Sequence, residues 1–305
     1  MPSPYHPELR GIRWIPRFSY GPRLVGLMRR LPQRPADHGP DVRVDEIAVT
    51  SAVSIRLLRP ANAKTPVPVL VWMHGGGHLI GSPEQDDVPN VAFVRELGIA
   101  VAAVRYRLGF DAPAPASVDD CYDALRHLVS HADELGIDPD RLAIGGASAG
   151  GGVAAGLVQR AHDSGEIAVR FQLLVYPMLD DRTVARTDLD TSRVRVWTPK
   201  SNRYGWRTYL GVEPGAPQVP LYAVPARRED LGGLPPAWIG VGTEDLFYNE
   251  DVAYARRLDQ AGVPCELEIV PGAFHGFDAL FRKTALVRAF WESQAAALRS
   301  AFGLT

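Results

Sequence analysis

The feature that most constrains the fold is a series of short apolar runs that alternate with helical patterns. In VPVLVWMH, residues 67–74, almost every position is apolar, which is typical of a parallel strand buried on both faces. Two alternating runs, 42–49 and 53–60, precede it and predict a hairpin. Further strands are predicted at residues 98–106, 141–148, 170–177, 237–244 and 265–272, and helices at 117–131, 149–161, 249–261 and 281–302. The alternation predicts an α/β fold, with a mostly parallel sheet of about eight strands between helices.

Two segments lie outside this alternation and divide the chain. Residues 1–40 are rich in proline and arginine, and residues 180–230 contain no predicted strand. We expect an N-terminal segment, 1–40, and an insertion, 180–230, attached to one core formed by residues 41–179 and 231–305. Within the first segment, Leu24, Leu27, Met28 and Leu31 recur at helical spacing. A basic amphipathic helix can touch an anionic membrane, but we favour a helix packed over the rest of the protein.

The overall composition excludes several classes of partner. The formal net charge of the 305 residues is -2, which gives no electrostatic reason to expect nucleic acid as a partner. No apolar run approaches the roughly 20 residues that a membrane span needs, so we expect no stable membrane insertion. The first residues lack the pattern of a signal peptide, and we expect a soluble, cytoplasmic protein. Cys121 and Cys265 are predicted to be free thiols in the core.

The stretch GGASAGGG, residues 145–152, surrounds one reactive side chain, Ser148, with glycine and alanine. It fits the pattern G-x-S-x-G and lies between a predicted buried strand and a predicted helix. On such a sharp turn, glycine two residues before and after the serine avoids collision with neighbouring backbone. Close packing of a helix on a sheet is an alternative that does not explain the serine. A phosphate loop is disfavoured, because no Lys-Ser or Lys-Thr follows. The stretch therefore predicts a nucleophilic serine.

A second glycine motif, HGGGH at residues 74–78, follows the predicted strand 67–74. Glycines there expose backbone N–H groups, and each N–H aimed at an oxyanion contributes about 2.7–4 kcal/mol to the transition state of acyl transfer. We predict that Gly75 and Gly76, together with the N–H of Ala149, form the oxyanion hole. His74 and His78 are expected to shape the loop.

A serine nucleophile needs a base and an orienting carboxylate. His275 follows the last predicted strand, at the sheet edge where Ser148 is expected. Asp245 follows the strand 237–244, and Glu244 is the fallback; Glu250 and Asp251 are expected to begin the next helix. The order Ser148, Asp245, His275 is that of α/β-hydrolases. No zinc or calcium pattern is present, so we expect no metal and no cofactor.

These residues resemble the hormone-sensitive-lipase-like carboxylesterases of the α/β-hydrolase superfamily. The resemblance covers about residue 40 to the C-terminus and rests on HGGG at 74–77, YRL at 106–108, GASAGG at 146–151, Asp245 with Glu250, and His275 in HGF. It implies the α/β-hydrolase fold, a helical cap made of residues 1–40 and 180–230, and metal-free ester hydrolysis. Family members are often dimers, so a homodimer is one state to expect. Ala147 departs from the aspartate that many members carry.

We therefore expect a serine carboxylesterase acting on short- to medium-chain acyl esters, with a small-molecule ester as its partner. Four aromatic residues of the insertion either line an apolar pocket or pack the cap onto the core: Trp197, Tyr204, Trp206 and Tyr209. Three alternatives remain open. The same triad could serve an amidase or peptidase, or an acyltransferase, and a relative of this fold could be a non-catalytic small-molecule receptor. Receptors typically lack a working triad, whereas this chain has all three candidates.

Overall fold

The computed structural model describes residues 4–31, 33–64 and 66–304, and its centre is one eight-stranded sheet. The strand order is β1-β2-β4-β3-β5-β6-β7-β8. Their bounds are β1 Val42–Ala48, β2 Ser54–Pro60, β3 Val67–Met73, β4 Ala100–Arg105, β5 Ile137–Ala147, β6 Phe171–Val175, β7 Ala237–Gly242 and β8 Cys265–Val270. β2 pairs antiparallel with both β1 and β4, and all other neighbours pair in parallel. The predicted mostly parallel α/β sheet is confirmed.

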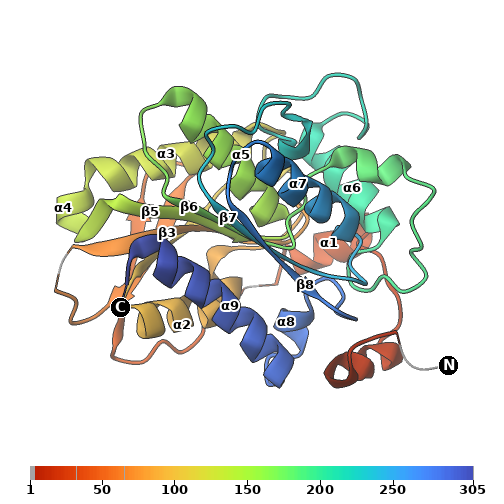
Figure 1. Cartoon of the computed structure of the whole chain (residues 1–305), viewed down its shortest axis with the longest axis horizontal. Helices are drawn as coiled ribbons and strands as arrows, with labels where there is room; N and C mark the ends of the chain where they lie inside the picture. Colours follow the sequence, from red (N-terminus) through yellow and green to blue (C-terminus); the bar gives the residue numbers. More distant parts are fainter. Residues whose placement is uncertain (1–3, 32, 65, 305) are drawn as a thin grey trace.

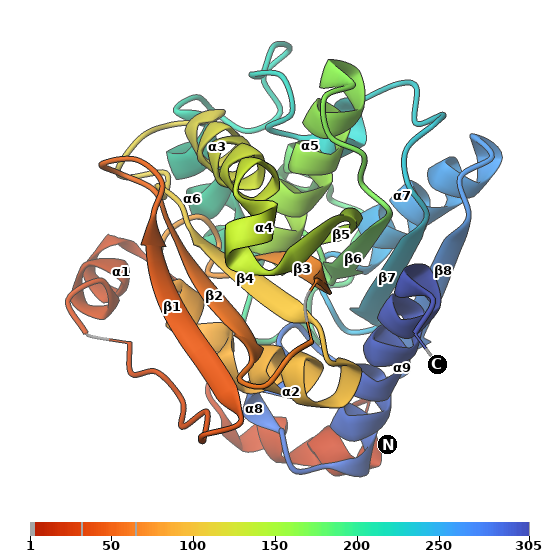
Figure 2. The ribbon, with the colours of Figure 1, turned by 90° about the vertical axis from the view of Figure 1, so that its left-hand side faces the viewer.

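Helices cover both faces of the sheet. They are α1 Pro22–Met28, α2 Asp87–Leu97, α3 Ala116–Ser130, α4 Ala132–Leu135, α5 Ala149–Ser164, α6 Pro199–Leu210, α7 Tyr248–Gln260, α8 Phe277–Leu280 and α9 Ala285–Phe302, with 3-10 turns at η1 Pro7–Trp14, η2 Pro83–Asp86, η3 Asp181–Ala185 and η4 Pro225–Arg227. Figures 1 and 2 show α3 and α5 on one side of the sheet and α2 and α9 on the other. The layered arrangement explains why every residue of the central strands β3, β6 and β7 is buried.

β3 illustrates how one strand serves two cores. Val69 and Val71 belong to the apolar cluster under α3, α5 and α7, whereas Leu70 and Trp72 belong to the cluster under α2 and α9. Successive side chains of a strand point to opposite faces. A strand covered on both sides must therefore be apolar throughout, which is the pattern read from residues 67–74.

Several local predictions differ from the structure. The helix α2 was not predicted, and the helix predicted over 281–302 begins at Ala285, where the Thr284 side chain caps it. The strand β8 lies at the sheet edge, so Ile269 is 39% exposed and Cys265 is only partly buried. Cys265 is therefore less buried than the core position that was predicted for it, whereas Cys121 is fully buried as predicted. Both cysteines are free.

The N-terminal segment contacts the insertion directly. The hydroxyl of Ser19 lies 2.7 Å from that of Thr198, and the backbone N–H of Tyr20 donates to Ser201. Val25 is the buried residue of α1, whereas Leu27 in the same helix and Leu31, beyond its end, are 58% and 59% exposed. The apolar face predicted from spacing is thus partly open to solvent. Within the described ranges, no helix is long and apolar enough to cross a membrane.

Candidate active site

Ser148 lies on the sharp turn between β5 and α5. Its φ of 57° and ψ of -122° place a non-glycine residue in a strained region. A Cβ on Gly146 would lie 2.5 Å from the backbone oxygen of Gly150, and a Cβ on Gly150 would lie 2.2 Å from that of Met73. Both glycines are therefore required by close backbone approach, as the pattern G-x-S-x-G indicated. The turn presents the serine hydroxyl at the start of α5.

The structure brings Ser148, His275 and Asp245 into one hydrogen-bonded chain. The Ser148 Oγ lies 2.8 Å from the His275 Nε2, and the His275 Nδ1 lies 2.8 Å from the Asp245 Oδ2. The second carboxylate oxygen of Asp245 accepts from the Phe247 N–H at 2.9 Å. Because the carboxylate accepts a hydrogen bond from the Nδ1–H, the imidazole proton stays on Nδ1 and the lone pair of Nε2 can accept the serine proton. All three side chains are buried.

The fallback carboxylate takes another place. The carboxylate of Glu244 forms no hydrogen bond with the imidazole, and it lies 4.0 Å from the guanidinium of Arg193. Asp245 follows β7 and His275 follows β8, and these strands are neighbours in the sheet. Asp245 is thus the acid of the two that is hydrogen-bonded to His275.

Two aromatic rings that sequence reasoning missed hold the His275 imidazole. The ring of Tyr176 lies 4.8 Å from the imidazole between centroids, and that of Phe247 lies 5.1 Å away, both in T-shaped arrangements. The hydroxyl of Tyr176 donates to Asp278 at 2.7 Å, which anchors the ring. The sequence offers one signal for this hydrogen bond between Tyr176 and Asp278, which is that Asp278 lies three residues after His275. The rings limit the orientations available to the imidazole.

The glycine loop after β3 passes directly beside the serine. A Cβ on Gly75 would lie 3.3 Å from the Cβ of Ser148, and a Cβ on Gly76, with φ +123°, would lie 2.0 Å from the oxygen of Ile80. Among the described residues, none accepts the N–H of Gly75 or Gly76. Ala149 is the first residue of α5, where no intrahelical carbonyl can accept its N–H. Within the described part of the chain, all three N–H groups are therefore without a protein acceptor.

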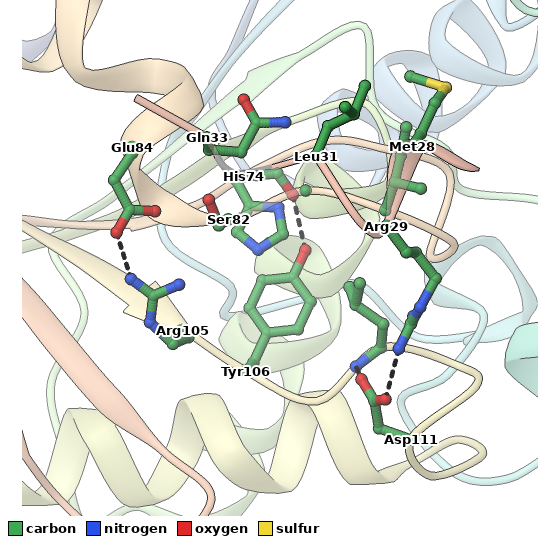
Figure 3. Close-up of a pocket in the computed structure, with 13 residues that line it drawn as sticks. Met28, Arg29, Leu31, Gln33, His74, Ser82, Glu84, Arg105, Tyr106 and Asp111 are labelled. Atoms are coloured by element: carbon green, nitrogen blue, oxygen red, sulfur yellow. Dashed lines mark hydrogen bonds and ion pairs between the residues drawn. The ribbon is translucent and has the colours of Figure 1, made fainter. Parts of the chain in front are cut away.

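The two histidines of this loop are packing residues. The Nδ1 of His74 donates to the Gly75 carbonyl at 2.8 Å, and the Tyr106 hydroxyl donates to the His74 carbonyl at 2.6 Å (Figure 3). His78 stacks on Tyr209 with 3.8 Å between ring centroids. Burial lowers the pKa of His74 to about 4 and that of His78 to about 3. Both rings are neutral at pH 7, as expected for residues that shape the loop.

Aromatic residues of the insertion pack against the glycine loop after β3. A Cβ on Gly77 would lie 1.9 Å from the ring of Trp197, so that the indole fills the space a side chain would need. Trp206 and Tyr209 are buried and belong to one apolar cluster with Trp197. Of the two roles considered for these aromatics, packing of the insertion onto the core is the one the contacts support.

Glu250 ties the insertion to α7. One carboxylate oxygen accepts from the backbone N–H groups of Leu179, at 2.8 Å, and Asp180, at 3.1 Å. Burial raises the pKa of Glu250 to about 8 and raises the pKa of the neighbouring Asp251 as well. Both acids lie in the first turn of α7, as expected. Their role is therefore structural, and the catalytic chain does not include them.

Comparison with known proteins agrees with this geometry. A family model described as alpha/beta hydrolase fold matches residues 70–279, more than half of the chain. The protein is thus an α/β hydrolase. It belongs to the hormone-sensitive-lipase-like carboxylesterases within that superfamily.

The individual relatives are esterases. Carboxylesterase NlhH of Mycobacterium tuberculosis is 34% identical over 248 residues, which cover 78% of this chain and 76% of the relative. An ethyl acetate hydrolase of Pseudomonas putida is 35% identical over 237 residues, 73% of this chain and 70% of the relative. The solved structure of a bacterial heroin esterase is 37% identical, with a TM-score of 0.87 over 98% of both chains. The chain is a carboxylic ester hydrolase.

Proposed function

We propose that the protein hydrolyses short- to medium-chain acyl esters through a Ser148–His275–Asp245 triad and an acyl-enzyme. The observation that carries the proposal is the unbroken hydrogen-bonded chain from the Ser148 Oγ through the imidazole to Asp245, with 2.8 Å at each step. A neutral serine is a weak nucleophile, and this arrangement supplies the base that activates it.

In the proposed mechanism the His275 Nε2 removes the proton from Ser148 as the hydroxyl attacks the acyl carbon. Asp245 keeps the proton on Nδ1 and stabilises the imidazolium that forms. The N–H groups of Gly75, Gly76 and Ala149 hold the oxyanion of the tetrahedral intermediate. His275 then protonates the leaving alcohol, and the same imidazole activates water to release the acid.

Support for short acyl groups comes from the crowding around Ala149. This residue belongs to a tightly packed apolar cluster that includes Trp197 and Trp206 of the insertion and Phe247 beside the imidazole. A large acyl group would have to displace these side chains. The name of the related ethyl acetate hydrolase points to a small acid component as well.

The remaining partner and location predictions are part of this proposal. We expect a small-molecule ester as substrate, no nucleic-acid partner, no stable membrane insertion, and a homodimer as a state to be tested. Two free cysteines are typical of a reducing compartment, which supports a cytoplasmic location.

Hydrolysis of p-nitrophenyl esters from acetate to palmitate tests the proposal, with wild type measured beside Ser148→Ala. Activity should peak at short to medium chains and fall on the order of 10⁶-fold in the variant. Retention of most activity by a folded Ser148→Ala protein would exclude Ser148 as the nucleophile. Adding alcohols as competing acceptors separates a hydrolase from an acyltransferase, and parallel anilide substrates separate it from an amidase.

A further inference from the structure

The 3-10 turn η1 leaves large apolar side chains in solvent. Leu9 and Ile12 of this turn are buried against the core. By contrast, Trp14 is 78% exposed and Ile15 is 40% exposed. The chain has six tryptophans, and the other five are buried or half-buried. Figures 1 and 2 show η1 at the edge of the fold. Apolar side chains grouped at such a place indicate a contact surface.

Cations surround these two side chains. Arg10 and Arg13 lie on the same turn and are exposed. The guanidinium of Arg13 lies 4.9 Å from the centroid of the Trp14 ring. The turn between α8 and α9 adds two further exposed cations, Arg282 and Lys283.

The α8–α9 turn lies directly beside η1. The backbone N–H of Leu286 donates to the Glu8 carboxylate at 3.0 Å, and a Cβ on Gly11 would lie 3.3 Å from the ring of Phe281. The two segments therefore form one surface, which we call the η1 face and define by Arg10, Arg13, Trp14, Ile15, Arg282 and Lys283.

The positive charge of the η1 face is not neutralised by its neighbours. Among the described residues, none forms an ion pair with its three arginines or its lysine. Arg282 donates to the Ala279 carbonyl, which carries no charge. Glu8 is the one carboxylate of η1. Four cations and one anion leave an excess of three positive charges on this face, although the whole chain has a formal net charge of -2.

This combination favours an anionic lipid surface as the occupant. Tryptophan beside arginine and lysine is typical of segments that lie at the membrane–water interface, because the ring enters the headgroup region while the cations meet lipid phosphates. A second copy of the chain, paired about a two-fold axis, would place the same cations opposite one another. A nucleic acid would use the cations but would leave the exposed Ile15 without an apolar partner.

We propose that the η1 face binds reversibly to a bilayer that contains anionic lipid, with Trp14 and Ile15 in the headgroup region and the four cations at the lipid phosphates. The contact involves the surface of two turns and requires no stable insertion. None of its residues belongs to the triad, so the proposal goes beyond ester hydrolysis and does not depend on it.

Sedimentation of the full-length protein with vesicles measures this binding. Vesicles of equal parts phosphatidylglycerol and phosphatidylcholine should bind about tenfold more tightly than pure phosphatidylcholine, and added salt should weaken the binding. Trp14→Ala should weaken it about tenfold, as should Arg10→Gln combined with Arg13→Gln. Arg23→Gln combined with Arg30→Gln removes two exposed cations of α1 instead and should bind within about twofold of wild type.

Tryptophan fluorescence locates the contact independently. Because Trp14 is the exposed tryptophan, anionic vesicles should shift the emission to the blue, and lipids with brominated acyl chains should quench it. Neither effect should occur in Trp14→Ala.

Four results would overturn the proposal. They are no binding to anionic vesicles, unchanged binding by Trp14→Ala, equal losses in the two double arginine variants, and a single-stranded oligonucleotide that binds as tightly as the vesicles. Hydrolysis of p-nitrophenyl acetate in solution should be the same in wild type and Trp14→Ala. Absence of hydrolysis in both would count against the proposed function alone.

Discussion

Burial disfavours ionisation of the Glu250 carboxyl in the folded protein. Replacing Glu250 by glutamine removes that ionisation. The carboxylate accepts from the N–H groups of Leu179 and Asp180 and from the hydroxyl of Thr183. A glutamine carbonyl can keep both backbone contacts, and its amide can donate to the threonine hydroxyl, which also accepts. Glu250→Gln therefore preserves the contacts and removes only the ionisation.

The expected effect follows from the pKa of Glu250, which burial raises from 4.5 to about 8. The folded state holds the proton more tightly than the unfolded state. The stability from this group is therefore fully present below about pH 4.5 and is lost as the pH rises through about 8. At about 1.4 kcal/mol per pH unit, the difference between the two pKa values corresponds to about 5 kcal/mol.

Urea unfolding at pH 5, 7 and 9 measures this difference. At pH 5 the free energies of unfolding of wild type and Glu250→Gln should agree within about 1 kcal/mol. Above that pH the variant should become progressively more stable than wild type, by a few kcal/mol at pH 9. The quantity to compare is the difference between the two proteins, because burial also raises the pKa of Asp251 and makes wild-type stability fall with pH for a second reason.

An exposed glutamate on α2 provides the matched control. Glu96→Gln should leave the pH dependence of stability as it is in wild type. If the stability difference between wild type and Glu250→Gln were the same at pH 5 and pH 9, the carboxyl would not be held neutral by burial, and the reasoning from its surroundings would be wrong.

Three further substitutions test the site and the packing. Asp245→Asn should lower kcat for p-nitrophenyl acetate about 10⁴-fold at pH 7, because it favours the wrong imidazole tautomer. The kcat of Glu244→Gln should stay within about twofold of wild type. Similar losses in both variants would reject Asp245 as the triad carboxylate. Gly150→Ala places a methyl group 2.2 Å from a backbone oxygen of β3 and should cost roughly 100-fold in kcat, so a fully active variant would contradict the close approach. Trp206→Ala should lower the free energy of unfolding, measured with urea, by about 3–5 kcal/mol. Trp14→Ala is the control, because the Trp14 side chain is 78% exposed. This control should change the free energy of unfolding by less than about 0.5 kcal/mol.

Much of the candidate site could be predicted because its signals are local. Gly146 and Gly150 mark the turn at Ser148, since no other residue fits that backbone. Asp245 and His275 each follow a strand of a parallel sheet, and the carboxyl ends of such strands meet at one edge. The structure accordingly brings all three side chains together. The choice of Asp245 over Glu244 was more uncertain, because successive residues of a loop differ in direction and the sequence does not specify which one turns inward.

Contacts between distant segments were not predictable in the same way. Tyr176, which follows β6, packs on His275, which follows β8, and Asp278 accepts a hydrogen bond from the Tyr176 hydroxyl. Helical spacing favoured Leu24, Leu27, Met28 and Leu31, yet Val25 is the buried residue of α1, in an apolar cluster that includes residues of the insertion. Amphipathic spacing shows that a helix has an apolar face, but neighbouring elements decide which part of that face they cover.

The sequence by itself determined the alternation of strands and helices, the strained serine turn and the glycine loop. Each depends on the period of apolar residues or on the backbone freedom of glycine, and both are properties of a few consecutive residues. Only the tertiary structure decided which carboxylate meets His275, the neutral state of Glu250 and the grouping of cations around the exposed Trp14. These features depend on desolvation and on distances between residues far apart in the chain, which exist only once the sheet, the N-terminal segment and the insertion have packed together.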